Sequence, residues 1–188
     1  MATEPFWLRP KKITLKDGTV VTLRPEEKGD LEPVWAMFST LSEESLQYLP
    51  IPITRERVEG WFREINYERA LPILGLVEEE GEARVIAASS LEFGQREHNK
   101  HVTTFGITVH DDYQKLGLGK KITEYMIEIA REKGLKKVAL EVVTHNSRAI
   151  NVYRRYGFKI EGRLEMNHWN HVLKEYGDDY VMGLILQN

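Results

Sequence analysis

Apolar positions along this chain recur with strand-like spacing in some segments and with helix-like spacing in others. Strand-like segments alternate apolar and polar residues or form short apolar runs, whereas helix-like segments repeat apolar residues every three or four positions. The expected strands are a hairpin at Lys11–Arg24, a second hairpin made by Pro72–Val77 and Arg84–Phe93, and His101–His110, Lys137–Val143, Phe158–Trp169 and Glu175–Leu186. The expected helices are Asp30–Leu41, Thr54–Tyr67, Leu118–Glu132 and Asn146–Tyr156.

Turn and capping residues support these boundaries. Asp17-Gly18 and Glu80-Gly81-Glu82 are turn sequences within the two hairpins, and Pro25 ends the first. Thr54 is a suitable N-cap, and Gly134 follows the expected helix at Leu118–Glu132. The bridge Ser42–Ile53 contains Tyr48-Leu49-Pro50-Ile51-Pro52, which does not favour continuation of either neighbouring helix.

The order of elements, ββ-αα-βββ-α-β-α-ββ, predicts an α/β fold in which one mixed sheet carries helices on both faces. At His101–His110, the alternate positions Thr103, Phe105, Ile107 and Val109 form one face of the expected strand. The 188 residues show no internal repeat and no separating linker, so we expect a single domain over residues 1–188.

Composition narrows the possible functions. The formal net charge of −3 gives no general attraction to nucleic acid or to an anionic membrane, so direct binding to either is not expected. The absence of cysteine excludes disulfides and thiolate chemistry. No apolar run approaches the roughly 20 residues of a membrane span, and we expect a cytoplasmic protein. A homodimer is compatible with the sequence, which does not define the oligomeric state.

The segment Gln114–Lys120, QKLGLGK, places two glycines between an expected strand and an expected helix. A glycine-rich turn that opens a helix is suited to bind phosphate, because free N–H groups and the helix dipole face the ligand. The Walker pattern fails, since Gln114 and Lys121 stand where it requires Gly and Ser or Thr. The dinucleotide pattern fails too, since Ile122 occupies the place of its third glycine.

The pattern Gln114-x-x-Gly117-x-Gly119 resembles the pyrophosphate loop, (Arg/Gln)-x-x-Gly-x-(Gly/Ala), of the acetyl-CoA-dependent N-acetyltransferases of the GNAT superfamily. GITVHDDYQKLGLGKKITEYMIEIAREKG is similar to the strand, loop and helix of that family, and LEVVTHNSRAINVYRRYGFKIEGRL to its following segment. Both matches lie within residues 102–164, the region of strongest resemblance. The opening LKDGTVVTLRPEEKGDLEPVWAMFSTLSEES is similar, less specifically, to GNAT domains of protein-lysine acetyltransferases.

The resemblance implies a binding site for acetyl-CoA, which serves as co-substrate. Backbone N–H groups of the glycine loop would bind its diphosphate, and Ile107 to Val109 would pair with its pantetheine arm. Asn146 is expected both to contact this ligand and to cap a helix. The residues expected to bind acetyl-CoA are Ile107, Thr108, Val109, Gln114, Lys115, Leu116, Gly117, Leu118, Gly119, Lys120, Asn146 and Tyr153.

Attack of an amine on a thioester requires a neutral amine, a donor to the oxyanion and a proton for the departing thiolate. The resemblance assigns the oxyanion donor to the Val109 N–H and the acid to Tyr153. Without the resemblance, a core tyrosine on an apolar helix face would be the better interpretation of Tyr153. Glu141, at a position where burial is expected, is the first candidate base and Glu92 the second; a water chain without a single base is a further alternative.

The acceptor is expected to be a primary amine of a protein, either a lysine side chain or an N-terminus. A small amine such as an amino acid, antibiotic or polyamine is the alternative, and a CoA-binding module without catalysis is a third. No metal site is expected. The pairs His98-x-x-His101 and His168-x-x-His171 have ligand-like spacing but lack the supporting motifs of zinc enzymes.

Overall fold

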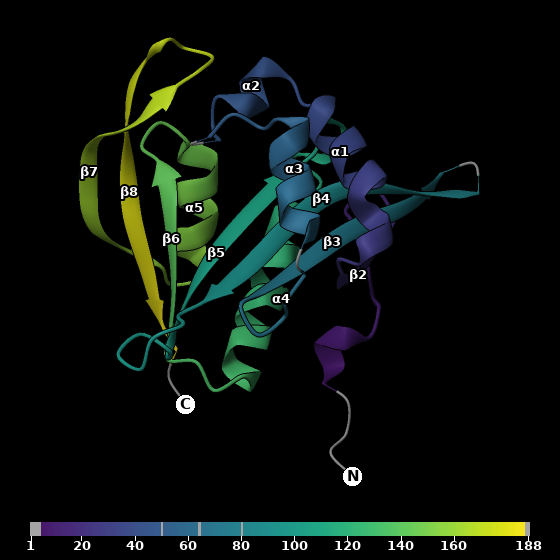
Figure 1. The fold of residues 1–188 in the computed structure, drawn as a ribbon, viewed down its shortest axis with the longest axis horizontal. Helices are drawn as coiled ribbons and strands as arrows, with labels where there is room; N and C mark the ends of the chain where they lie inside the picture. Colours follow the sequence, from purple (N-terminus) through teal and green to yellow (C-terminus); the bar gives the residue numbers. More distant parts are fainter. Residues whose placement is uncertain (1–4, 50, 64, 80, 187–188) are drawn as a thin grey trace.

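The computed structural model describes residues 5–49, 51–63, 65–79 and 81–186, and within them eight strands form one mixed sheet (Figure 1). The order across the sheet is β1-β2-β3-β4-β5-β6-β8-β7. The strands are β1 Lys11–Thr14, β2 Val20–Pro25, β3 Ala70–Glu79, β4 Glu82–Phe93, β5 Val102–Val109, β6 Lys137–Val143, β7 Lys159–Asn170 and β8 Glu175–Ile185. Pro50 of the predicted bridge, Glu64 of a predicted helix and Glu80 of a predicted turn lie outside the described residues, as do residues 1–4, 187 and 188.

The predicted helices are present, with shorter bounds for three of them. The helices are α1 Leu31–Ser39, α2 Glu43–Leu46, α3 Arg55–Arg63, α4 Leu118–Glu132 and α5 Ser147–Arg155, with single 3₁₀ turns at Phe6–Leu8, Lys28–Asp30 and Asp111–Tyr113. The prediction of a helix up to Tyr67 was wrong, because Asn66 forms a turn by accepting a hydrogen bond from the Glu68 N–H. Thr54 is confirmed as the N-cap, since its hydroxyl accepts from the Arg57 N–H at 3.3 Å.

The short helix α2 was not predicted. It occupies the bridge between α1 and α3, where Ser42 caps it by accepting a hydrogen bond from the Ser45 N–H at 3.2 Å. A helix of four residues is too short to show apolar periodicity, so only its cap could have indicated it.

Helices cover both faces of the sheet, as predicted. Helices α1 and α3 pack on one face through a core that includes Val34, Phe38 and Val58 (Figure 1). Helices α4 and α5 pack on the other face, where α4 buries Ile122 and Met126. Each side chain of the central strands therefore faces one of two separate helix layers, according to its place in the alternation.

The sheet opens between β5 and β6, its only parallel pair among the described strands. Pairing covers three positions, from Val102 opposite Lys137 to Thr104 opposite Ala139, and then stops. Beyond this point β5 stays paired with β4 as far as Val109, and β6 with β8 as far as Val143. Residues 105–109 thus have a backbone edge that no strand among the described residues pairs with.

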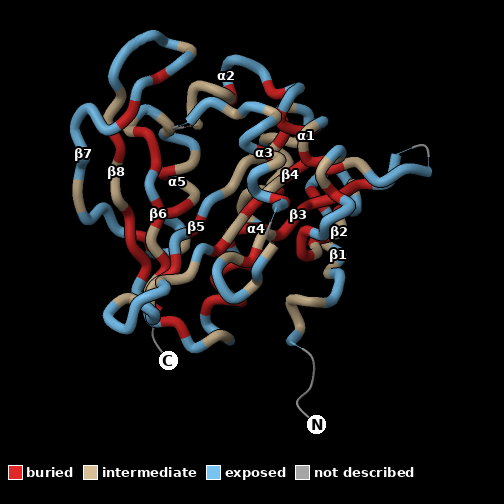
Figure 2. Tube along the Cα trace, viewed as in Figure 1, coloured by how far each residue is buried: buried red, intermediate tan, exposed pale blue. Residues whose placement is uncertain are grey.

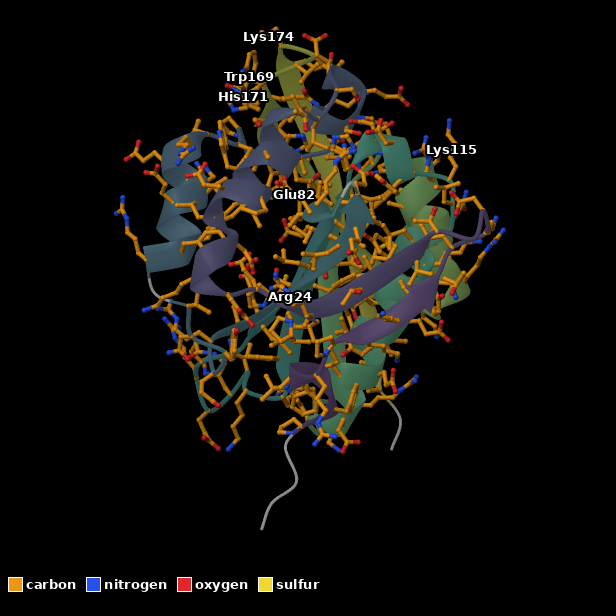
Figure 3. The ribbon with its side chains drawn as sticks, turned by 90° about the vertical axis from the view of Figure 1, so that its right-hand side faces the viewer. Arg24, Glu82, Lys115, Trp169, His171 and Lys174 are labelled. Atoms are coloured by element: carbon orange, nitrogen blue, oxygen red, sulfur yellow. The ribbon has the colours of Figure 1, made fainter. Side chains whose placement is uncertain are left out.

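Strands β7 and β8 form a long hairpin at one side of the sheet, and much of β7 is exposed (Figure 2). Trp169, His171 and Lys174 lie together at the end of this hairpin (Figure 3). Among the described helices, none has the length and apolar character needed to cross a bilayer.

Candidate active site

The glycine loop, Gln114–Lys120, turns the chain from β5 into α4 through two residues with left-handed backbone conformation. Lys115 has φ 64° and Gly117 has φ 95°, and Gly117 is the N-cap of α4. Glycine accepts this conformation without steric cost, whereas Lys115 adopts it at some expense. Figure 3 places Lys115 at the edge of the molecule.

The loop presents a set of free donors. Among the described residues, no group accepts a hydrogen bond from the backbone N–H of any residue from 115 to 120. A Cβ built on Gly119 would meet no heavy atom within 4 Å, so the space above this part of α4 is open. Free N–H groups at the positive end of a 15-residue helix form a site suited to a diphosphate.

Gln114 holds the loop in place through its side chain. Its amide nitrogen donates to the Ser45 hydroxyl at 2.8 Å and to the Val109 carbonyl at 3.2 Å, and its amide oxygen accepts from Arg148 at 2.5 Å. The loop is also fixed to the β1–β2 turn, where the Lys16 N–H donates to the Leu116 carbonyl at 3.2 Å. Gln114 is therefore engaged within the protein, and its side chain positions the loop.

The free edge of β5 is built from alternate residues. His110 donates to the Ile86 carbonyl, and Gly94 donates to the Val102 carbonyl, so the even-numbered residues of β5 direct their N–H and C=O groups toward β4. The odd-numbered residues Ile107 and Val109 then direct their backbone N–H and C=O groups toward the opening beside β6. Of the three residues expected to pair with pantetheine, Thr108 faces β4 instead.

Tyr153 lies beside this opening on α5. It is buried, and its ring contacts that of Phe105 in a T-shaped arrangement with 6.2 Å between centroids. Burial raises the pKa of Tyr153 to about 12, which keeps the phenol protonated at neutral pH. Its hydroxyl makes no hydrogen bond with the described residues, so it is available as a proton donor.

Asn146 is the N-cap of α5, as predicted, and its side-chain oxygen accepts from the Ala149 N–H at 3.1 Å. Its position directly after β6 brings it to the same end of the sheet as the glycine loop. The capping role accounts for its residue type on its own.

The expectation that Glu141 is buried was wrong. Val138, Leu140 and Val142 are the β6 residues that pack into the α4–α5 core, and Glu141 faces the opposite side, where it is exposed. The Asn167 amide donates to Glu141 at 3.4 Å and to Asp179 at 2.8 Å. Strand alternation puts Glu141 on the face that α1 and α3 cover at β3 and β4, outside the α4–α5 core.

A pocket of about 620 Å³ lies between this face of the sheet and helices α1 and α3, and we call it the α1–α3 pocket. The residues that line it include Glu26, Phe38, Trp61, Arg69, Ser90, Glu92, Phe93, Gly106, Ile107 and Thr108. It reaches β5 at Gly106 to Thr108, where β5 is paired with β4 on one edge and has no described strand on the edge toward β6. Glu92 lines the pocket and is exposed, and its carbonyl accepts from the buried Thr103 hydroxyl at 2.9 Å.

Sequence reasoning missed Glu26, which follows the last residue of β2. It is 5% exposed and lines the α1–α3 pocket. Burial, reinforced by the nearby Asp30 carboxylate and opposed by Arg24, raises the pKa of Glu26 to about 7. A glutamate directly after a strand-ending proline was the only sequence signal, and it does not distinguish a pocket residue from a solvated one.

The histidines do not gather into a metal site. Within residues 5–49, 51–63, 65–79 and 81–186, no group of three or more His, Cys, Asp or Glu side chains could hold a metal ion. His168 is buried and bound to Asp179 at 3.0 Å, and the exposed His98 lies in the β4–β5 loop.

Replacement of Glu26 by Gln is expected to change how stability depends on pH. The folded pKa of Glu26 lies above the ordinary value of 4.5, so wild-type protein loses stability as pH rises from about 4.5 to 7, by on the order of 3 kcal/mol. Glu26→Gln lacks this loss, so its stability relative to wild type should rise between pH 5 and pH 8 in urea unfolding. Exposed Glu132→Gln on α4 is the control, and a Glu26→Gln difference that stays constant with pH would contradict the assignment.

Known proteins show similarity to this chain in sequence and in fold. The sequence profile described as the acetyltransferase (GNAT) family matches residues 35–158. The chain is 31% identical over 104 residues to the L-amino acid N-acetyltransferase AaaT of Escherichia coli, covering 54% of this chain and 62% of that protein. It is 36% identical over 67 residues to the ribosomal protein bS18-alanine N-acetyltransferase of E. coli, and this match covers 36% of this chain and 45% of that protein.

A further relative is the spermine/spermidine N(1)-acetyltransferase of Bacillus subtilis, 31% identical over 85 residues that cover 45% of this chain and 56% of the relative. These matches each span less than two thirds of the relative's length. Among solved structures, the ribosomal-protein-S5-alanine acetyltransferase from Vibrio fischeri has a TM-score of 0.76 at 14% identity, over 93% of this chain and 96% of that one, which shows a shared fold. The family profile covers more than half of the sequence, and the chain therefore belongs to the acetyltransferase (GNAT) family.

Proposed function

We propose that this protein transfers the acetyl group of acetyl-CoA to a small primary amine by direct attack of the amine on the thioester. One observation carries the proposal: the α1–α3 pocket meets the free-edged strand β5 at Gly106 to Thr108, next to a loop of unoccupied N–H donors. An acyl donor lying along β5 and an acceptor in the pocket would come together there.

The residues present fit acetyl-CoA as the donor. The N–H groups of residues 115–120 would bind its diphosphate, with Lys115 and Lys120 adding positive charge. The Val109 N–H and the Ile107 C=O would pair with the amides of its pantetheine arm, as a sheet edge pairs with an added strand. The ligand supplies the acetyl thioester; the protein supplies its position.

The odd-numbered amides of β5 also serve the developing oxyanion. The glycine loop comes after the end of β5 at Val109. A pantetheine arm that begins at the diphosphate in this loop would therefore pass Val109 first and then run along β5 toward Ile107. We assign the Val109 N–H to that arm, and the Ile107 N–H, one edge position deeper, to the carbonyl oxygen of the acetyl group. This differs from the sequence-based prediction, which gave the oxyanion to Val109.

Two proton transfers complete the reaction. As the C–N bond forms and the C–S bond breaks, the attacking nitrogen loses a proton and the departing sulfur gains one. We assign the donor to Tyr153, whose hydroxyl makes no hydrogen bond with the residues that the structure describes, and the acceptor of the amine proton, through water, to Glu141. The β5–β6 register would place Glu141 level with Gly106 across the opening.

The volume of the α1–α3 pocket favours a small acceptor, since about 620 Å³ lies in the range typical of small-molecule sites. A protein amine remains a second candidate. It is supported by the 36% identity with the bS18-alanine N-acetyltransferase over 67 residues.

Turnover of acetyl-CoA against a panel of amines tests the function. We expect release of CoA with at least one class of small primary amine, at a kcat/KM at least tenfold above that for peptides with a free N-terminus or lysine. Higher activity on peptides would support the second candidate. Binding of acetyl-CoA by calorimetry without turnover on any acceptor would indicate a CoA-binding module and contradict the proposal.

Replacement of the two candidate bases by Gln should separate their roles. Glu141→Gln is expected to lower kcat at neutral pH by 10- to 100-fold, and rising pH should partly restore it because the amine then deprotonates without help. Glu92→Gln should change kcat less than threefold. A steady-state pH profile of each variant is the measurement, and the reverse order would transfer the base role to Glu92.

Tyr153→Phe should lower kcat by roughly 10- to 100-fold while the affinity for acetyl-CoA and the midpoint of thermal unfolding stay close to wild type. The unchanged stability follows from the absence of a hydrogen bond from the Tyr153 hydroxyl to the described residues. A variant with full activity would assign Tyr153 to the core alone.

A further inference from the structure

Glu26 is a buried carboxylate that the proposed reaction does not use. It is 5% exposed, and no hydrogen bond or ion pair joins its carboxylate to the described residues. Its own backbone carbonyl, by contrast, accepts from the Tyr67 hydroxyl at 2.7 Å, and its N–H donates to the Pro72 carbonyl at 3.1 Å. The backbone of Glu26 is fixed, and its carboxylate has no hydrogen-bond partner among the described residues.

Arg24, the cation whose charge acts on Glu26, is paired with another carboxylate. Arg24 donates to both carboxylate oxygens of Asp30 at 2.7 Å, and Asp30 also accepts from the Glu27 N–H at 2.7 Å. This bidentate pair fixes the guanidinium beside the loop that follows β2 (Arg24 is labelled in Figure 3). A buried carboxylate is costly unless a cation or N–H donor reaches it, so the missing partner of Glu26 is expected to come from outside the chain.

The α1–α3 pocket gives access to Glu26 and connects it with the site of acetyl transfer. Glu26, directly after β2, lies beside Pro72 of β3, which is followed across the sheet by Ser90 of β4 and Gly106 of β5. Three strand spacings separate the first from the last, roughly 14 Å between Cα atoms. Ser90 and Gly106 are small, so they leave space in the pocket next to the sheet. Phe38, Trp61 and Phe93 line the pocket with apolar surface.

The pocket also contains charges that bear on the acceptor. Glu92 adds a second carboxylate, and Arg69 is the cation that lines the pocket. Arg69 and Glu92 are exposed, so solvent screens them, whereas Glu26 is nearly removed from water. The strongest charge preference in the pocket is therefore that of Glu26, for a positive group.

We propose that Glu26 binds a second ammonium group of the acceptor, so that the preferred substrates are linear diamines or longer polyamines. The inference rests on the proposed function, because it requires one amine to react at Ile107 while the other pairs with Glu26. The apolar walls would contact the methylene chain between them, and the separation of the two ends favours long chains over short ones.

Wild-type protein provides the first test, with pairs of equal chain length: 1,8-diaminooctane against n-octylamine, and 1,4-diaminobutane against n-butylamine. We expect kcat/KM to be at least tenfold higher for the long diamine than for its monoamine. The advantage should be smaller for the short pair, since a four-carbon chain does not span the pocket. Equal values for n-octylamine and 1,8-diaminooctane, or a preference for α-amino acids, would overturn the inference.

Glu26→Gln provides the second test. It should lower kcat/KM for 1,8-diaminooctane at least tenfold, change that for n-octylamine less than threefold, and abolish diamine binding measured by calorimetry in the presence of CoA. Glu132→Gln, on the opposite face of the sheet, should change none of these. Thermal unfolding checks that Glu26→Gln is folded, and Glu26→Asp, which keeps the charge, should retain part of the diamine preference.

The two levels of the proposal fail in different ways. If wild-type protein acetylates neither monoamines nor diamines nor any other small amine, the proposed function is wrong. If it acetylates n-octylamine and 1,8-diaminooctane equally, and Glu26→Gln changes neither, the function stands and the role of Glu26 is wrong.

Discussion

The separation of β5 from β6 is the constraint on which the rest of this structure depends. Parallel pairing ends after Thr104, yet each strand keeps its outer partner for several more residues. Phe105, the first residue past the last pair, packs against Tyr153 of α5, so aromatic side chains fill the space beneath the opening. The result is a backbone edge that no described strand pairs with beyond Thr104, that β4 holds from its other side, and that an extended ligand can reach.

Charge is distributed so that the two sides of this opening suit opposite partners. Free N–H groups, lysines and the N-terminus of α4 form a positive region on the glycine-loop side. Three carboxylates, those of Glu26, Glu92 and Glu141, lie on the face of the sheet that carries the α1–α3 pocket. A net charge of −3 conceals both regions, because the preference for an anionic donor and for a cationic acceptor arises locally.

The sequence predicted the elements and the donor loop because both are encoded locally. The spacing of Gly117 and Gly119 identified the loop, and apolar periodicity identified every long helix and strand. Features that depend on segments distant in sequence could not be predicted from local patterns. The burial of Glu141 was predicted wrongly, because the alternation within β6 does not show which face of the strand is covered by helices at that position. Glu26 was missed because its surroundings come from residues distant in sequence: it lines the α1–α3 pocket, and its backbone is bonded to Tyr67 and Pro72.

Amide hydrogen exchange measured residue by residue by NMR, with and without CoA, tests the central claim most directly. In free protein, the Ile107 and Val109 amides should exchange quickly, and the Gly106 and Thr108 amides, paired with β4, slowly. Saturating CoA should slow exchange at Val109 and at residues 115–120. Protection of Ile107 and Val109 in the free protein, or no change on addition of millimolar CoA, would contradict an open edge on β5 that holds the acyl donor.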